Sequence, residues 1–177
     1  ASDRLRSNEC LKQKAEALLG VPVKIFAPAD YNGVIEGLLG GNLDILASFR
    51  TTQNLLFDLY DTPAEVDRLV GEITTAWLRF LNEQEAVIAG STRGRSPWAP
   101  IWAPEITYML QSDFAYMISP QMFERFVLPD LAACCEKLDH GFYHLDGKGQ
   151  IKHIDLLLSL ERLRGIQWIP GAGGPQA

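Results

Sequence analysis

His144 and Asp146 are the pair of residues in this sequence with the clearest capacity for chemistry. An apolar and aromatic run beginning at Phe142 carries both of them, and Gly147 and Gly149 end it. If the run is a strand, the two side chains point to the same side, because side chains alternate between faces with a period of two. An imidazole can move protons near neutral pH, and a neighbouring carboxylate can fix its tautomer. The spacing thus predicts an acid/base or metal-holding pair. An equally weighted alternative is a local hydrogen bond for His144 and a helix cap for Asp146.

Other polar residues occur where apolar, strand-like runs end. Asp113 follows one such run and Gln167 lies in another, with Gln111 and Trp168 beside them. Parallel α/β folds place their chemistry at the carboxyl ends of the strands. We therefore expect Asp113 to join His144 and Asp146 as a catalytic residue. The three neighbours Gln111, Gln167 and Trp168 are the expected substrate-binding residues.

The elements that must position these residues alternate along the chain. Short β-rich runs predict strands at 23–27, 43–47, 110–113, 142–145 and 166–169. Apolar residues at helical spacing predict helices at 4–19, 33–39, 51–60, 63–85, 120–138 and 151–160. This alternation predicts an α/β fold with a mainly parallel sheet built from βαβ units.

Local start and stop signals refine the helices. The clearest start is Thr62-Pro63, where Thr62 is the expected N-cap and Glu65 completes a capping box. Ser119 should cap the helix that begins at Pro120, and Pro129 predicts a kink or a restart within it.

Two tryptophans lie among prolines in the loop-like segment 90–104. Trp98 and Trp102 alternate with three prolines, a composition typical of a rigid loop. Such a loop can lie over a pocket. It can also cover the end of the core, which is the interpretation that we favour slightly.

Composition narrows the classes of partner. The 177 residues carry a formal net charge of −6, and no run of Lys and Arg stands out. This balance disfavours a nucleic-acid partner and an anionic membrane surface. No apolar run approaches the length of a membrane span. Three cysteines, two of them adjacent, match neither a disulfide framework nor a zinc spacing, so we expect a reduced, cytoplasmic protein.

The opening of the chain resembles the substrate-binding proteins of phosphonate ABC transporters. The residues that carry the likeness lie at 19–24 (LGVPVK), 28–37 (PADYNGVIEG) and 43–45 (LDI). The resemblance implies an N-terminal αβα segment from a periplasmic-binding-protein-like fold. It also implies that Tyr31 contacts an anionic phosphonate and that the helix beginning beside Tyr31 offers backbone N–H groups to it. We favour the interpretation that this N-terminal segment is an inherited structural piece and not a working binding site.

From about Leu43 onward the chain resembles the C-terminal part of the uroporphyrinogen decarboxylase family, in its branch related to corrinoid methyltransferases. The matching segments are 43–50 (LDILASFR), 55–61 (LLFDLYD), 110–114 (LQSDF), 117–123 (MISPQMF), 126–129 (FVLP), 143–147 (YHLDG) and 165–171 (GIQWIPG). The resemblance implies part of a (β/α)8 barrel with its site at the carboxyl ends of the strands. It also implies that Asp113, His144, Asp146 and Gln167 lie at such ends, in a decarboxylase or a corrinoid-dependent methyltransferase.

The chain departs from that family in two ways. The methyltransferase branch has a zinc-binding His-x-Cys-Gly where this chain has His144-Leu145-Asp146-Gly147, and no later Cys or His completes a zinc ligand set. Zinc is therefore a weak expectation, with His144 and Asp146 as the candidate ligands. The N-terminal barrel half, which holds the tetrapyrrole in the decarboxylases, has no counterpart in these residues.

The two resemblances meet at 43–45, which predicts a chimera or fragment. We expect a phosphonate-binding-protein-like segment at 1–46 and a partial barrel at 47–177 that share one core. We expect the isolated chain to lack the full catalytic activity of the barrel family. The alternative function is an anion-binding module that takes a phosphonate or another small-molecule ligand. Exposed strand edges make a homo-oligomer plausible.

Overall fold

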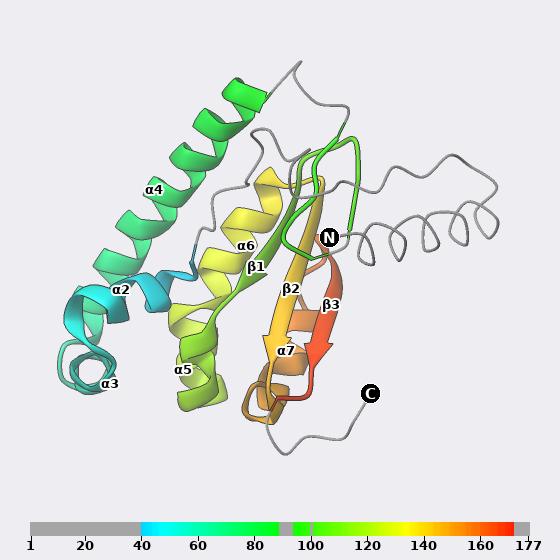
Figure 1. The fold of residues 1–177 in the computed structure, drawn as a ribbon. Helices are drawn as coiled ribbons and strands as arrows, with labels where there is room; N and C mark the ends of the chain where they lie inside the picture. The colour runs from blue at the N-terminus through cyan, green and yellow to red at the C-terminus, as the bar shows by residue number, and fades with distance from the viewer. Residues whose placement is uncertain (1–39, 89–93, 100, 172–177) are drawn as a thin grey trace, which may run out of the picture. The chain divides into compact units, whose positions relative to one another are not determined.

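The computed structural model describes residues 40–88, 94–99 and 101–171 (Figure 1). The chain divides into two compact units, residues 1–35 and 36–177, and every described residue belongs to the second. The predicted helices at 4–19 and 33–39 and the predicted strand at 23–27 lie outside the described residues. The expected boundary after residue 46 stays a prediction.

The first described element corrects a prediction. Residues 43–47 were expected to form a strand, but they belong to the helix α2, Asn42–Arg50. Leu43 and Leu46 are buried while Ile45 is only half-buried, a spacing of three that suits a helix and not a strand. A short apolar run cannot be assigned by periodicity alone. A long-range contact favours the helix here, because Asn42 at the start of α2 donates a 2.9 Å hydrogen bond to the Phe126 carbonyl.

Two further helices follow as predicted. These are α3, Thr52–Asp61, and α4, Pro63–Ile88, which begins at the expected proline. The Thr62 hydroxyl, however, donates to the Asp58 carbonyl at 3.4 Å, and Glu65 pairs with Arg68 instead of completing a capping box. The apolar stripe of α4 packs inward, with Trp77 in edge-to-face contact with Tyr108 at 5.2 Å between ring centroids.

The sheet has three parallel strands in the order β1-β2-β3 among the described residues (Figure 1). These are β1, Thr107–Gln111, β2, His140–Asp146, and β3, Leu163–Ile169. The predicted strand at 110–113 therefore begins and ends earlier, because Asp113 already starts a 3-10 turn. Parallel neighbours require helical crossovers, and both are present. The second unit is thus an α/β structure with a parallel sheet.

The first crossover consists of η1, Asp113–Met117, α5, Pro120–Phe126, and α6, Leu128–Lys137. Ser119 caps α5 as predicted, its hydroxyl accepting from Met122 N–H, and the helix restarts just before Pro129. The second crossover consists of η2, Lys148–His153, and α7, Ile154–Leu158. α7 lies within the helix predicted at 151–160, whereas η2 begins before it.

One face of the sheet forms the core with the helices. Tyr108 and Leu110 on β1 and Tyr143 and Leu145 on β2 are buried on this face. Figure 1 shows α6 running beside the strands, and its residues Leu131, Cys134 and Cys135 belong to the same apolar cluster. The other face carries the alternate residues, which are half-buried along β2. Within the described part, no helix is both long and apolar enough to cross a membrane.

Candidate functional site

The parallel register places Gln111, His144 and Gln167 in one row across the three strands. Gln111 pairs with His144 in the ladder, and His144 pairs with Gln167. Residues in register on neighbouring strands point to the same face. The Nδ1 atom of His144 lies 2.6 Å from Oε1 of Gln167. Because an amide oxygen only accepts, this contact puts a proton on Nδ1, and in the neutral imidazole Nε2 then keeps its lone pair.

A tryptophan from the preceding loop contacts the same imidazole. The Trp98 ring meets the His144 ring edge-to-face, with 4.7 Å between centroids. The loop predicted to cover the end of the core therefore brings Trp98 to the sheet face opposite the helices. Trp98 stays 48% exposed there, and Trp102 is 59% exposed.

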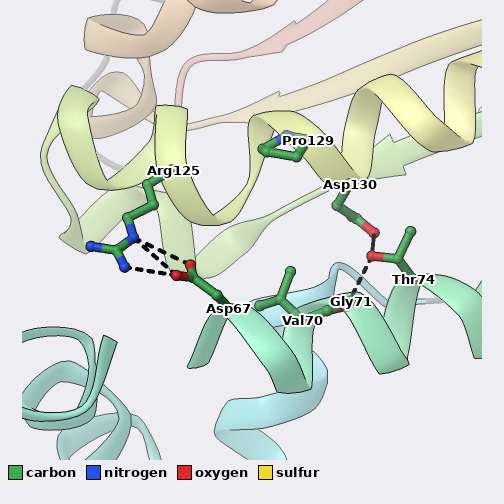
Figure 2. Close-up of a pocket in the computed structure, with 7 residues that line it drawn as sticks. All are labelled: Asp67, Val70, Gly71, Thr74, Arg125, Pro129 and Asp130. Carbon is green, nitrogen blue, oxygen red and sulfur yellow. Dashed lines mark hydrogen bonds and ion pairs between the residues drawn. The ribbon is translucent and has the colours of Figure 1, made fainter. Parts of the chain in front are cut away.

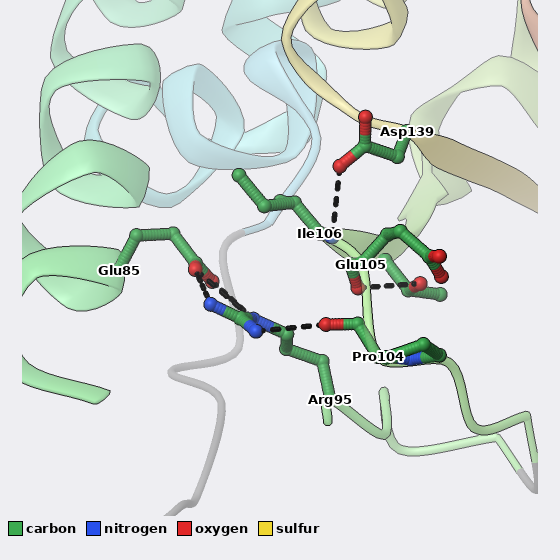
Figure 3. Close-up of polar contacts among 7 residues, drawn as sticks. Glu85, Arg95, Pro104, Glu105, Ile106 and Asp139 are labelled. Atoms are coloured by element: carbon green, nitrogen blue, oxygen red, sulfur yellow. Dashed lines mark hydrogen bonds and ion pairs between the residues drawn. The ribbon is translucent and has the colours of Figure 1, made fainter. Parts of the chain in front are cut away.

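An ion pair with α4 holds that loop in place (Figure 3). Arg95 donates to the carboxylate of Glu85 through Nε and Nη2, and its Nη1 donates to the Pro104 carbonyl at 2.9 Å. Both charged side chains are largely buried, so the pair is a fixed tether and not a solvated contact. Farther along, Ile106 N–H donates to Asp139 Oδ2 at 3.0 Å, which ties the start of β1 to the start of β2.

Asp146 lies on the same face as His144, as the period of two predicted. Residues 140, 142, 144 and 146 are half-buried while those between them are buried. No hydrogen bond joins Asp146 to His144 among the described contacts. Nor does Asp146 cap the next element, because Gly147 occupies the N-cap position of η2 with a φ of 77°, a conformation that favours glycine.

Asp113 lies where β1 ends, at the carboxyl edge that it was expected to share with His144. Its side chain is exposed, and its described contact is made by its backbone N–H, which donates to Asp44 Oδ2 at 3.0 Å. The sheet therefore brings Gln111, His144 and Gln167 into one row. Asp113 is at the same edge without a contact to that row.

One other expected residue, Trp168, is not brought into this row. Trp168 pairs with Leu145, whose side chain is buried on the helical face of the sheet, so Trp168 points away from the His144 side. Tyr31, the expected phosphonate contact, lies outside the described residues.

The sequence patterns did not identify two carboxyl groups that the fold shields from solvent, the half-buried Asp44 and the buried Asp130. Asp44 accepts hydrogen bonds from Asp113 N–H at 3.0 Å and Phe114 N–H at 2.7 Å, and burial raises its pKa despite these donors. Asp130 is 8% exposed, and burial raises its pKa to about 6. A carboxylate in the first turn of a helix was the available signal in both cases, but it cannot reveal burial.

The described residues fit a zinc ion poorly. No group of three or more His, Cys, Asp or Glu side chains there is arranged to hold a metal. His144 and Asp146 alone supply two ligands, whereas protein zinc sites use three or four. We therefore derive no reaction step through zinc.

The chain matches no protein-family model, no curated protein and no solved structure.

Proposed function

We propose that the carboxyl edge of this sheet is part of a barrel-enzyme site of the uroporphyrinogen decarboxylase or corrinoid-methyltransferase type. In this proposal the isolated chain does not carry out the full reaction. The observation that supports it best is the 2.6 Å contact between His144 Nδ1 and Gln167 Oε1 on neighbouring parallel strands. Such a partner holds an imidazole in one tautomer and orientation, which general acid/base chemistry requires.

The role that follows for His144 is proton transfer through Nε2. Gln167 holds the ring from one side, and Trp98 packs against it at 4.7 Å. Asp146 adds a carboxylate on the same face, where it can orient a polar group of a ligand. Gln111, in register with His144, offers an amide to the same ligand.

The proposed lack of full activity follows from the number of strand ends. A barrel enzyme gathers its catalytic groups from several strands, and accurate placement can supply roughly 7–11 kcal/mol of the barrier reduction. The described sheet contributes three strands, and only two of them join in the contact that fixes His144. In the partial (β/α)8 barrel proposed here, the remaining groups would have to come from elsewhere.

The first test is the tautomer of His144, measured by long-range ¹H–¹⁵N NMR on the full chain. We expect the Nδ1–H form, and we expect Gln167→Ala to remove that preference. Gln111→Ala is the matched control, because Gln111 lies in the same row but makes no hydrogen bond to the imidazole. An Nε2–H form in the unmodified chain would contradict the proposed role.

The second test is activity. The purified chain should not decarboxylate a porphyrinogen, and zinc should be lost on brief treatment with a mild chelator. Decarboxylation that disappears in His144→Ala would overturn the proposed lack of activity. Zinc that resists chelation would overturn the proposed absence of a working metal site.

A further inference from the structure

A pocket of about 340 Å³ lies between α4 and the α5–α6 segment, on the helical side of the sheet (Figure 2). Its apolar lining comes from Val70 and Gly71 on α4 and Pro129 on α6. A Cβ atom added to Gly71 would meet nothing within 4 Å, so the pocket is open at this point of the helix. Small-molecule sites commonly combine such a lining with a few polar groups.

Asp130 is the buried polar group of this pocket. Its side chain lines the pocket although the residue is only 8% exposed. Its Oδ1 lies 2.5 Å from Thr74 Oγ1, and the same hydroxyl lies 2.9 Å from the Val70 carbonyl (Figure 2). A hydroxyl has one proton to donate. If that proton goes to Val70, Asp130 must itself be protonated to bond Thr74.

The second carboxyl oxygen of Asp130 has no protein partner in the described part of the chain. Among the described residues, the polar side-chain atoms that are fully enclosed and lack a partner are Ser112 Oγ and His153 Nδ1, and Oδ2 of Asp130 is not one of them. Oδ2 is therefore not fully enclosed, and Asp130 is one of the residues that line the pocket. A carboxyl oxygen in this position is ready to accept a hydrogen bond from a ligand.

The cationic side chain that lines the pocket is already paired. Arg125 donates to both carboxylate oxygens of Asp67, with Nη2 2.7 Å from Oδ2. The nearby thiol of Cys134 stays uncharged, because burial and the Asp130 carboxylate raise its pKa. When Asp130 is ionised, the lining thus carries one uncompensated negative charge.

We propose that this pocket binds a small organic cation, an alkylammonium group, with its nitrogen on Asp130 Oδ2. An ammonium has three donors and no acceptor, which complements a carboxylate oxygen without a partner. A short hydrocarbon chain would lie against Val70, Gly71 and Pro129. The ligand would be either a free amine or a lysine side chain of another protein, since both present the same chemistry.

Proton linkage gives the proposal a distinctive signature. Burial raises the pKa of Asp130 to about 6, and a bound cation favours the ionised carboxylate. The affinity should therefore increase by roughly tenfold between pH 5 and pH 7.5, as the ionised fraction rises. The other two charged groups of the lining, Asp67 and Arg125, are paired with each other, and this contact raises the pKa of Arg125, so we expect no comparable change from the pair.

The test is a titration of the full chain with n-butylammonium chloride, followed by amide chemical shifts at pH 5 and pH 7.5. n-Butanol is the neutral control. Shifts should map to α4 and α6, and Asp130→Asn should weaken binding at pH 7.5 by about tenfold or more. Gly71→Met should also abolish binding, because the larger side chain fills the pocket. The variant should still fold, since replacing a helical glycine favours the helix.

Each outcome bears on the proposal. Tighter binding of an Nα-acetyl-lysine amide than of n-butylammonium supports the site and assigns it to a protein lysine, and the reverse order supports it and assigns it to a free amine. Equal binding of n-butanol, unchanged binding in a folded Asp130→Asn variant, or no binding of either amine would overturn it.

Discussion

Asp44 accepts a hydrogen bond from the backbone N–H of Asp113, although both residues carry acidic side chains and lie 69 positions apart. A second bond from Phe114 N–H, at 2.7 Å, completes the contact. Two otherwise unpaired donors at the start of η1 are satisfied in this way. The contact fastens α2 to the carboxyl end of β1, the edge that carries the candidate site.

Removing the Asp44 carboxylate should therefore destabilise the unit. We expect Asp44→Ala to lower the free energy of unfolding by roughly 1–3 kcal/mol, because it leaves two backbone donors without a partner. Chemical denaturation at neutral pH measures this. Asp113→Ala is the matched control, since Asp113 contributes only its backbone N–H, and its effect should stay within about 0.5 kcal/mol. Equal losses in the two variants would contradict the assignment.

His153 should make stability fall in mild acid. The residue is fully buried, its Nε2–H donates to the Ala115 carbonyl at 2.8 Å, and its ring stacks on Phe123. Burial lowers the pKa of His153 below its ordinary value of 6.5. The unfolded chain then takes up the proton first, so this contribution is complete above pH 6.5 and is lost as the pH falls below it, at no more than about 1.4 kcal/mol per pH unit.

The measurement compares unfolding free energies of the unmodified chain and His153→Leu at pH 7.5 and pH 5.5. The advantage of the unmodified chain should shrink at the lower pH, by at most about 1.4 kcal/mol. His140→Leu serves as the control, because His140 is 38% exposed in its side chain and pairs with Glu105 at the surface. A pH-independent gap for His153→Leu would rule out a buried neutral imidazole.

Asp130 should have the opposite effect to His153, because it should lower the free energy of unfolding as the pH rises. Its pKa of about 6 in the folded chain exceeds the ordinary value of 3.8. Its stabilising contribution is therefore complete below pH 3.8 and is lost as the pH rises through 6. The ionised form costs up to roughly 3 kcal/mol at pH 8, since one pKa unit corresponds to about 1.4 kcal/mol.

Asp130→Asn removes that ionisation while keeping the shape of the side chain. We expect it to be more stable than the unmodified chain at pH 8 and nearly equal to it at pH 4. Thermal unfolding at the two values measures the change. Asp67→Asn is the comparison on the same pocket, because Asp67 is half-exposed and paired with Arg125. A constant effect of Asp130→Asn at both pH values would show that Asp130 does not change ionisation in this range.

The sheet edges give a prediction about assembly. Among the described residues, β1 and β3 each pair with one strand only, and Ile169 on β3 is 37% exposed. Unpaired edges readily pair with another chain. We propose a homo-oligomer, and light scattering should give a mass above the 19.7 kDa of one chain. Ile169→Lys should lower that mass by placing charge on the edge, whereas a monomer at high concentration would contradict the proposal.

Several elements could be predicted from the sequence because their signals are local. Pro63 begins α4, Ser119 caps α5 and Pro129 lies at the restart of α6, as expected from capping and from the missing N–H of proline. The period of two along β2 likewise predicted that His144 and Asp146 share a face. The same rule separates Gln167 from Trp168, because adjacent residues on a strand face opposite sides.

The remaining features depended on partners far along the chain. The run at 43–47 has no local preference strong enough to choose between strand and helix. The hydrogen bond that Asn42 donates to Phe126 and the two that Asp44 accepts from the N–H groups of residues 113 and 114 favour the helix. The sheet register decided that Gln167 and not Asp146 bonds His144. Burial of Asp130 against Thr74, 56 positions away, likewise follows from helix packing. Local sequence therefore determined where α4, α5 and α6 begin and which residues of β2 share a face. Tertiary packing decided the state of residues 43–47 and which polar groups meet, because burial and long-range pairing are properties of the whole fold.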